Sequence, residues 1–145
     1  MIVMDGGLRA LHHEALQRQA RQRLDILDET RAALQAKQSG LNQRQIADLL
    51  VTSQPKVHRL LKAIDRRGGE LNEDPEELIL RAFVYDTPRD ELVERLVEFQ
   101  YSFGEDAPDP HEGRIPGTWD QVVSAAAQGL LNEDEFAAIR SRFER

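Results

Sequence analysis

The part of the chain that decides its fold is the stretch at positions 43–62, which reads QRQIADLLVTSQPKVHRLLK. Its apolar residues recur at the three- and four-residue spacing of a helix. These inward positions are Ile46, Leu50, Val57, Leu60 and Leu61. Ala47 is the small residue that two short helices need where they approach each other at a steep angle. The stretch therefore predicts two short helices, over 42–50 and 54–67, joined by a tight turn.

The second of these helices begins with a start signal. Ser53 precedes it, and its hydroxyl is expected to accept a hydrogen bond from the backbone N–H of Lys56. Pro55 fits the first turn, because a backbone N–H at that position has no helical partner. With the apolar residues inward, the outward positions are Gln54, Lys56, His58, Arg59 and Lys62. The second helix is therefore expected to expose a polar and mostly basic face.

Residues 43–62 resemble the helix-turn-helix superfamily of DNA-binding proteins, and the resemblance covers about positions 41–66 of the 145. It implies that the second helix lies in the major groove of double-stranded DNA. Members of the superfamily usually have Gly at the place of Val51 and an apolar residue at the place of Thr52. Because valine disfavours a left-handed backbone, we expect the turn to have a different shape here.

The outward positions and the resemblance together indicate a set of DNA-binding residues. They are Arg44, Ser53, Gln54, Lys56, His58, Arg59, Lys62 and Arg66. Gln54, Lys56 and Arg59 are expected to carry base recognition, because Gln pairs with adenine and Arg or Lys with guanine through two hydrogen bonds. Arg59 fits a phosphate contact equally well, and His58 also fits a solvated surface position. Arg44 is placed to touch a phosphate, and Arg66 extends the basic surface.

The charge of the chain is divided unequally along its length. Residues 1–69 carry 12 Lys or Arg and 7 Asp or Glu, whereas residues 70–145 carry 7 and 19, which gives the net charge of −7. Such asymmetry indicates a basic part that binds a polyanion and an acidic part with another task. We therefore expect a helix-turn-helix DNA-binding region at 1–69 and an acidic helical region, for dimerisation or partner binding, at 70–145.

The remaining sequence also has helical spacing, so the expected fold is all-α, with a long N-terminal helix before the helix-turn-helix unit. That long helix spans about 5–37, and Gly40 follows as its C-terminal cap. Its apolar stripe consists of Leu8, Leu11, Leu16, Ala20, Leu24, Leu27 and Leu34. One helix-turn-helix unit is too short to cover this stripe, which favours a helix from a second copy and hence a homodimer.

Capping residues mark the helices of the acidic half. The expected helix starts are Asp74 before Pro75, Thr87 before Pro88, Thr118, and Asn132 with Glu135. Residues 104–118 contain three Pro and three Gly and are expected to form a loop or an ordered irregular segment. The aromatic residues of this half are expected in its core, with an interaction surface as the alternative for some of them: Phe99, Tyr101, Phe103, Trp119, Phe136 and Phe143.

Several classes of function find no support in the sequence. The absence of cysteine excludes disulfides, thiolate metal sites and cysteine nucleophiles. The adjacent His12 and His13 point about 100° apart on a helix and make a poor metal pair. The acidic loop matches no known cation-binding spacing at its candidate ligands, Asp106, Asp109, His111 and Glu112. We expect no metal, no cofactor and no enzyme activity.

Neither a signal peptide nor a membrane-spanning stretch is visible, which predicts a cytoplasmic protein without a membrane partner. Two functions fit. One is a transcriptional regulator that binds DNA as a dimer through the second helix of residues 43–62. The alternative is an antitoxin-like or adaptor protein whose acidic half binds a partner protein, with DNA binding used for autoregulation. The two differ in whether the purified chain alone binds DNA specifically, and in whether it co-purifies with a smaller basic protein.

Overall fold

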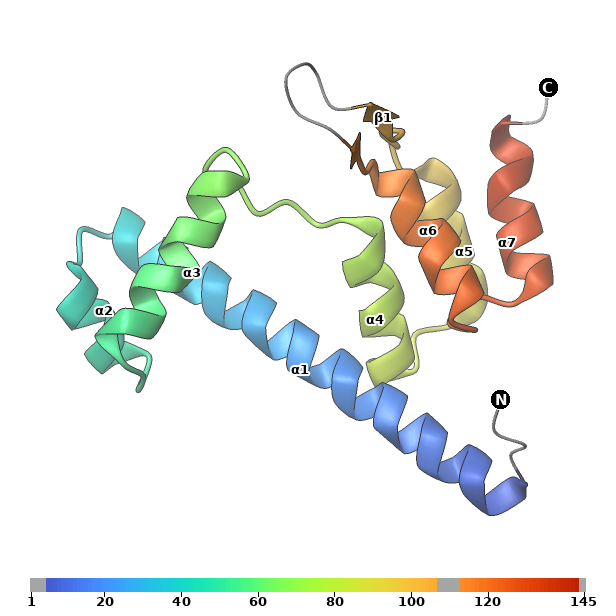
Figure 1. Ribbon diagram of the computed structural model, residues 1–145, viewed down its shortest axis with the longest axis horizontal. Helices are drawn as coiled ribbons and strands as arrows, with labels where there is room; N and C mark the ends of the chain where they lie inside the picture. Colours follow the sequence, from blue (N-terminus) through green and yellow to red (C-terminus); the bar gives the residue numbers. More distant parts are fainter. Residues whose placement is uncertain (1–4, 107–112, 144–145) are drawn as a thin grey trace. The chain divides into compact units, whose positions relative to one another are not determined.

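The computed structural model describes residues 5–106 and 113–143, and within them the fold is all-α, as predicted (Figure 1). The helices are α1 (Gly6–Gln38), α2 (Gln43–Leu49), α3 (Gln54–Arg66), α4 (Pro75–Tyr85), α5 (Arg89–Glu98), α6 (Thr118–Ala127), α7 (Glu133–Arg140) and a 3-10 turn, η1 (Ser141–Phe143). Two short strands, β1 (Glu105–Asp106) and β2 (Arg114–Ile115), pair antiparallel inside the expected loop. No helix in the described part of the chain is long and apolar enough to cross a membrane.

The chain divides into two compact units. One consists of Arg21–Asn72, and the other consists of Met1–Ala20 together with Glu73–Arg145. The first carries ten Lys or Arg and six Asp or Glu, whereas the second carries nine and twenty. We call them the basic unit and the acidic unit. The long helix α1 contributes its first part to the acidic unit and its second part to the basic unit.

This division differs in two places from the expected regions, 1–69 and 70–145. The basic unit continues past Gly69 because Leu71 packs against its core, and the Leu71 carbonyl accepts a hydrogen bond from Arg31 Nη2 at 3.4 Å. The first twenty residues belong to the acidic unit, where the ring of His13 meets that of Phe83 edge-on, with centroids 5.4 Å apart. Contacts between distant residues, and not the change of charge along the chain, therefore define the units.

The basic unit has a small aliphatic core where the end of α1 meets α2 and α3. Its buried residues are Ala33, Ala36, Ile46, Ala47, Val57, Leu60, Leu61 and Ile64. Leu34 of the predicted stripe packs against this core. The stripe as a whole is only partly buried, because Leu8 and Leu11 near the start of α1 are 42% and 61% exposed.

In the acidic unit, helices α4 to α7 surround a second core (Figure 1). Helix α4 packs on α5 and α6, and α7 packs on the same two helices. The start of α5 is tied to α7 by Arg89, which donates to the Glu135 carboxylate from Nε at 2.6 Å and from Nη2 at 2.7 Å. Arg89 Nη2 also donates to the Leu130 carbonyl at 2.9 Å. The hydrogen bonds from Arg89 lower the pKa of Glu135.

Two of the predicted helix starts in this unit are confirmed. The Asp74 carboxylate accepts from the backbone N–H of Glu77 at 2.8 Å, before a proline in the first turn of α4. Asn132 and Glu135 form the reciprocal capping box at the start of α7, with hydrogen bonds of 2.8 and 2.9 Å. At both starts the polar side chain satisfies backbone N–H groups that a helix leaves without partners.

The other two predicted caps are wrong. Helix α5 begins after Pro88, and no side chain caps it, so Thr87 does not play that part. Helix α6 begins after Gly117, whose N–H donates to the Asp120 carboxylate at 2.8 Å. The Thr118 hydroxyl instead accepts from the backbone N–H of Ser102 at 2.9 Å. The segment before β1 thus uses the hydroxyl that the local sequence would assign to the helix cap.

An aromatic cluster covers one end of the acidic unit and consists of Phe99, Tyr101, Phe103, Trp119, Phe136 and Phe143. The Trp119 ring contacts those of Tyr101, Phe136 and Phe143, with centroids 5.0 to 5.9 Å apart. The Tyr101 hydroxyl donates to the Leu96 carbonyl, and burial raises the pKa of Tyr101 to about 12. Phe103 and Phe143 remain 56% and 42% exposed. The cluster is therefore core on its inner side and surface on its outer side.

Candidate nucleic-acid interface

Helix α3 starts as its sequence predicts. The Ser53 hydroxyl accepts from the backbone N–H of Lys56 at 3.3 Å, and Pro55 lies in the first turn. Val57, at 0% exposure, anchors the helix in the core of the basic unit together with the other predicted inward residues of α3. The helix is strongly amphipathic, so its polar residues lie on the opposite face.

Most of the predicted DNA-binding residues are exposed on or beside that face. The exposed members are Arg44, Ser53, Gln54, His58, Arg59, Lys62 and Arg66. Six come from α3 or its N-cap, and Arg44 comes from α2. The face combines an amide, an imidazole and three cations on one helix, which are the donor and acceptor groups that read base edges and phosphates.

Lys56 differs from the other outward residues. Its ammonium group lies 2.9 Å from a carboxylate oxygen of Glu29 on α1, and its side chain is 42% exposed. The helical spacing predicts that Lys56 points outward into solvent. Its side chain is instead directed toward α1. Glu29 was not among the predicted site residues, because nothing in the local sequence pairs positions 29 and 56.

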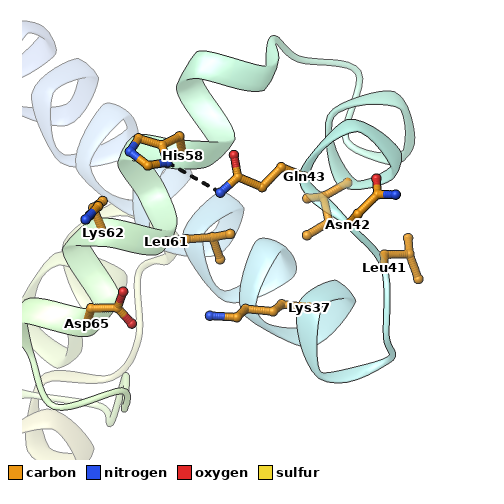
Figure 2. A pocket seen from close by; sticks show the side chains of 9 residues that line it. Lys37, Leu41, Asn42, Gln43, His58, Leu61, Lys62 and Asp65 are labelled. Carbon is orange, nitrogen blue, oxygen red and sulfur yellow. Dashed lines mark hydrogen bonds between the residues drawn. The ribbon is translucent and has the colours of Figure 1, made fainter.

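A second unpredicted contact joins α2 to α3. The Gln43 amide nitrogen lies 3.4 Å from His58 Nδ1 (Figure 2). At the same end of α2, Asn42 and Gln45 form a capping box with two hydrogen bonds of 2.9 Å. The first turn of α2 is thus held firmly beside the exposed face of α3.

The turn between α2 and α3 contains a strained residue. Val51 has a φ of 56°, so the expected difference in turn shape is not found: valine adopts the left-handed backbone itself. The Thr52 N–H donates to the Ala47 carbonyl at 3.0 Å, and the Val51 N–H donates to the Asp48 carbonyl at 3.4 Å. This is the hydrogen-bond pattern that closes a helix through a left-handed residue. The conformation costs about 1–2 kcal/mol, and the packing of the two flanking helices maintains it.

An open pocket of about 350 Å³ lies beside the exposed face, between the end of α1, the start of α2 and the second half of α3 (Figure 2). Leu41, Ile46 and Leu61 supply its apolar lining. The polar residues that line it are Lys37, Asn42, Gln43, His58, Lys62 and Asp65. The pocket therefore joins two predicted DNA-binding residues, His58 and Lys62, to Lys37, which the sequence reading did not single out.

In the described part of the chain, no three His, Cys, Asp or Glu side chains are grouped so that they could hold a metal ion. Of the acidic loop, Asp106 is described and exposed, whereas Asp109, His111 and Glu112 lie outside the described residues. Comparisons with protein-family models, curated proteins and solved structures find no match to this chain. The interpretation of the site therefore rests on its own residues and geometry.

Proposed function

We propose that the protein is a sequence-specific DNA-binding transcriptional regulator that places α3 in the major groove of double-stranded DNA. The observation that carries the proposal is the division of α3 into two faces. One face is buried in the core of the basic unit, and the other exposes Gln54, Arg59 and Lys62 behind a capped N-terminus. An α-helix of this width fits the major groove, where side chains of these types read base edges.

Within this proposal the polar residues of α3 have different tasks. Gln54 and Arg59 are exposed in the first two turns and are assigned to adenine and guanine, respectively. Lys56 is assigned to positioning, because its ion pair with Glu29 holds the start of α3 against α1. Arg44 and Arg66, exposed on α2 and at the end of α3, are assigned to phosphates.

The regulator is further proposed to act as a homodimer. A single recognition helix contacts few base pairs and gives little selectivity, whereas a two-fold dimer doubles the contacts. Its binding site would be a pseudo-palindrome with half-sites about 10 base pairs apart, or a multiple of that distance. The phosphates would repel the acidic unit, which carries twenty Asp or Glu.

The test is to select bound fragments from genomic DNA and then to compare two variants on the selected site. Arg59→Ala should lose about 1–3 kcal/mol of binding free energy and relax the preference at one base position. Lys56→Ala is the matched control on the same helix, and it should keep the base preference. Failure to enrich any sequence would contradict the proposal. Equal loss of affinity for all sequences with Arg59→Ala would make Arg59 a phosphate contact.

A second candidate function, an antitoxin-like or adaptor protein, is favoured by the outer side of the aromatic cluster. Phe103 and Phe143 are large, exposed and adjacent, with ring centroids 5.4 Å apart, and Arg142 lies over the Phe143 ring. Aromatic residues and arginine are enriched where proteins bind one another. The chain purified from its native source should then carry a smaller basic protein, and Phe103→Ser with Phe143→Ser should release it. Retention of that protein by the double variant would argue against this surface.

A further inference from the structure

The three lysines of the chain, Lys37, Lys56 and Lys62, all belong to the basic unit. Lys56 forms the ion pair with Glu29, whereas Lys37 and Lys62 line the pocket between α1, α2 and α3 (Figure 2). Both pocket lysines are exposed, and neither is in an ion pair with another described residue. Lysine side chains from two different helices therefore line one open recess.

The remaining polar groups of the pocket also favour an anion. Asn42 and Gln43 add carboxamide groups to the lining, and the Gln43 amide nitrogen lies 3.4 Å from His58 Nδ1. Asp65 is the one carboxylate among the lining residues. Lysine is a compact charge with three donors on a flexible stem, which suits an exposed oxyanion whose orientation is not fixed. The net charge of the recess is thus positive at neutral pH.

The position of the pocket indicates which kind of anion it binds. His58 and Lys62 belong both to the pocket lining and to the exposed face of α3 that is proposed to enter the major groove. A duplex that receives α3 has its sugar-phosphate backbone along the rim of that groove. We infer that this pocket binds the phosphate backbone of the DNA, with Lys37 on one side and Lys62 on the other. This inference rests on the proposed function and adds Lys37, from the end of α1, to the interface.

Acetylation of lysine side chains, read by mass spectrometry, tests the inference on the full-length protein. A duplex of random sequence at low salt is the probe, because phosphate contacts do not depend on base sequence. Lys37 and Lys62 should be acetylated several-fold more slowly with the duplex than without it. Inorganic phosphate at the same total phosphate concentration should protect neither lysine. Equal protection by inorganic phosphate would overturn the assignment to a DNA backbone.

Substitutions supply a second measurement. Lys37→Ala should reduce the slope of log affinity against log salt by about 0.9, the value for one phosphate contact. Lys37→Arg should restore the slope, and Arg9→Ala, at an exposed position of α1 in the acidic unit, should leave it unchanged. Asp65→Asn should tighten binding at low salt, because it removes the carboxylate from the recess. Circular dichroism of each variant would show that α1 and α3 are intact.

The outcomes separate this inference from the proposed function. If the duplex does not bind at low salt, the proposed function itself fails. If the duplex binds and protects Lys62, but Lys37 is acetylated at the same rate with and without it, only the pocket assignment is overturned. An unchanged salt slope for Lys37→Ala in a protein that binds DNA would lead to the same conclusion.

Discussion

The two units of this chain differ in their charged residues and in the side chains that form their cores. The basic unit contains all three lysines and no aromatic residue, and an aliphatic core of Ala, Ile, Leu and Val holds its helices. The acidic unit contains all the Phe, Tyr and Trp residues of the chain and no lysine, and a cluster of six aromatic rings extends from its core to its surface.

The two units differ in the size of the side chains that form their cores. In the basic unit, the end of α1, α2 and α3 enclose a small core, where alanine residues let the helices approach, and the surface of the unit carries the cations. The acidic unit buries larger side chains, which contribute more free energy per residue through their apolar area. It also gives an experimental advantage, because Trp119 fluorescence reports only on the acidic unit and lysine chemistry only on the basic unit.

The largest expected loss of stability comes from truncating one buried side chain in the core of each unit. Leu96→Ala in the acidic unit and Ile46→Ala in the basic unit both truncate side chains with 0% exposure and should each cost about 3 kcal/mol. Urea unfolding followed by Trp119 fluorescence should shift for Leu96→Ala and much less for Ile46→Ala. Far-UV circular dichroism should detect both. Equal shifts of the fluorescence midpoint would show that the two cores unfold together.

The next largest loss of stability is expected at Gly117, where two backbone segments of the acidic unit lie close together. A Cβ at Gly117 would overlap the backbone of Ser102 and Phe103, which pass alongside the start of α6. Gly117→Ala should therefore destabilise the acidic unit by about 2 kcal/mol, because backbone cannot yield as a flexible side chain does. The control is Gly7→Ala in α1, where the added Cβ meets only one side-chain atom at ordinary contact distance. A neutral effect of Gly117→Ala on the fluorescence midpoint would contradict this packing.

In the basic unit, Val51 and Gly40 form a matched pair, since each follows a helix end with a left-handed backbone, at φ values of 56° and 93°. Val51→Gly should stabilise the unit by about 1 kcal/mol, because relief of the steric strain exceeds the entropy that glycine loses. Gly40→Ala should destabilise it by a similar amount. Thermal unfolding followed by circular dichroism measures both, and a loss of stability in Val51→Gly would refute the strain at this turn.

The smallest effect concerns pH and the ion pair of the acidic unit. Hydrogen bonds from Arg89 lower the pKa of Glu135 below its ordinary value of 4.5. The unfolded chain therefore takes up this proton at a higher pH, so the stabilisation is present above pH 4.5 and is lost as the pH falls below it. Because the Arg89 side chain is 45% exposed, we expect less than about 1 kcal/mol.

Glu135→Gln isolates this effect, because glutamine keeps the capping box of α7 and removes the charge. The fluorescence midpoint of this variant should fall less steeply below pH 4.5 than that of the parent. Glu133→Gln, at an exposed position in the same turn, is the control and should leave the pH dependence almost unchanged. If the unfolding midpoints of the parent and of Glu135→Gln fell equally steeply below pH 4.5, the ion pair would make no measurable contribution to stability.

The sequence by itself determined the all-α fold, the approximate bounds of the three helices α1 to α3, and two helix starts in the acidic unit. Helix α4 begins at Pro75 after its cap Asp74, as predicted, and the caps Ser53 and Asn132 are also found where they were expected. The inward residues of α3 were also predictable. The physical reason is that helical spacing and capping act within a few residues, so a short stretch of chain contains the whole of their cause.

The tertiary structure alone decided which distant residues meet. In the basic unit, Lys56 forms an ion pair with Glu29, and Lys37 lines the same pocket as His58 and Lys62. In the acidic unit, the Thr118 hydroxyl accepts a hydrogen bond from Ser102, and the ring of His13 contacts that of Phe83. The tertiary structure also holds Val51 in a backbone conformation that its side chain disfavours. Each of these depends on helices packed against one another, and the free energy of that packing outweighs local preferences of about 1 kcal/mol.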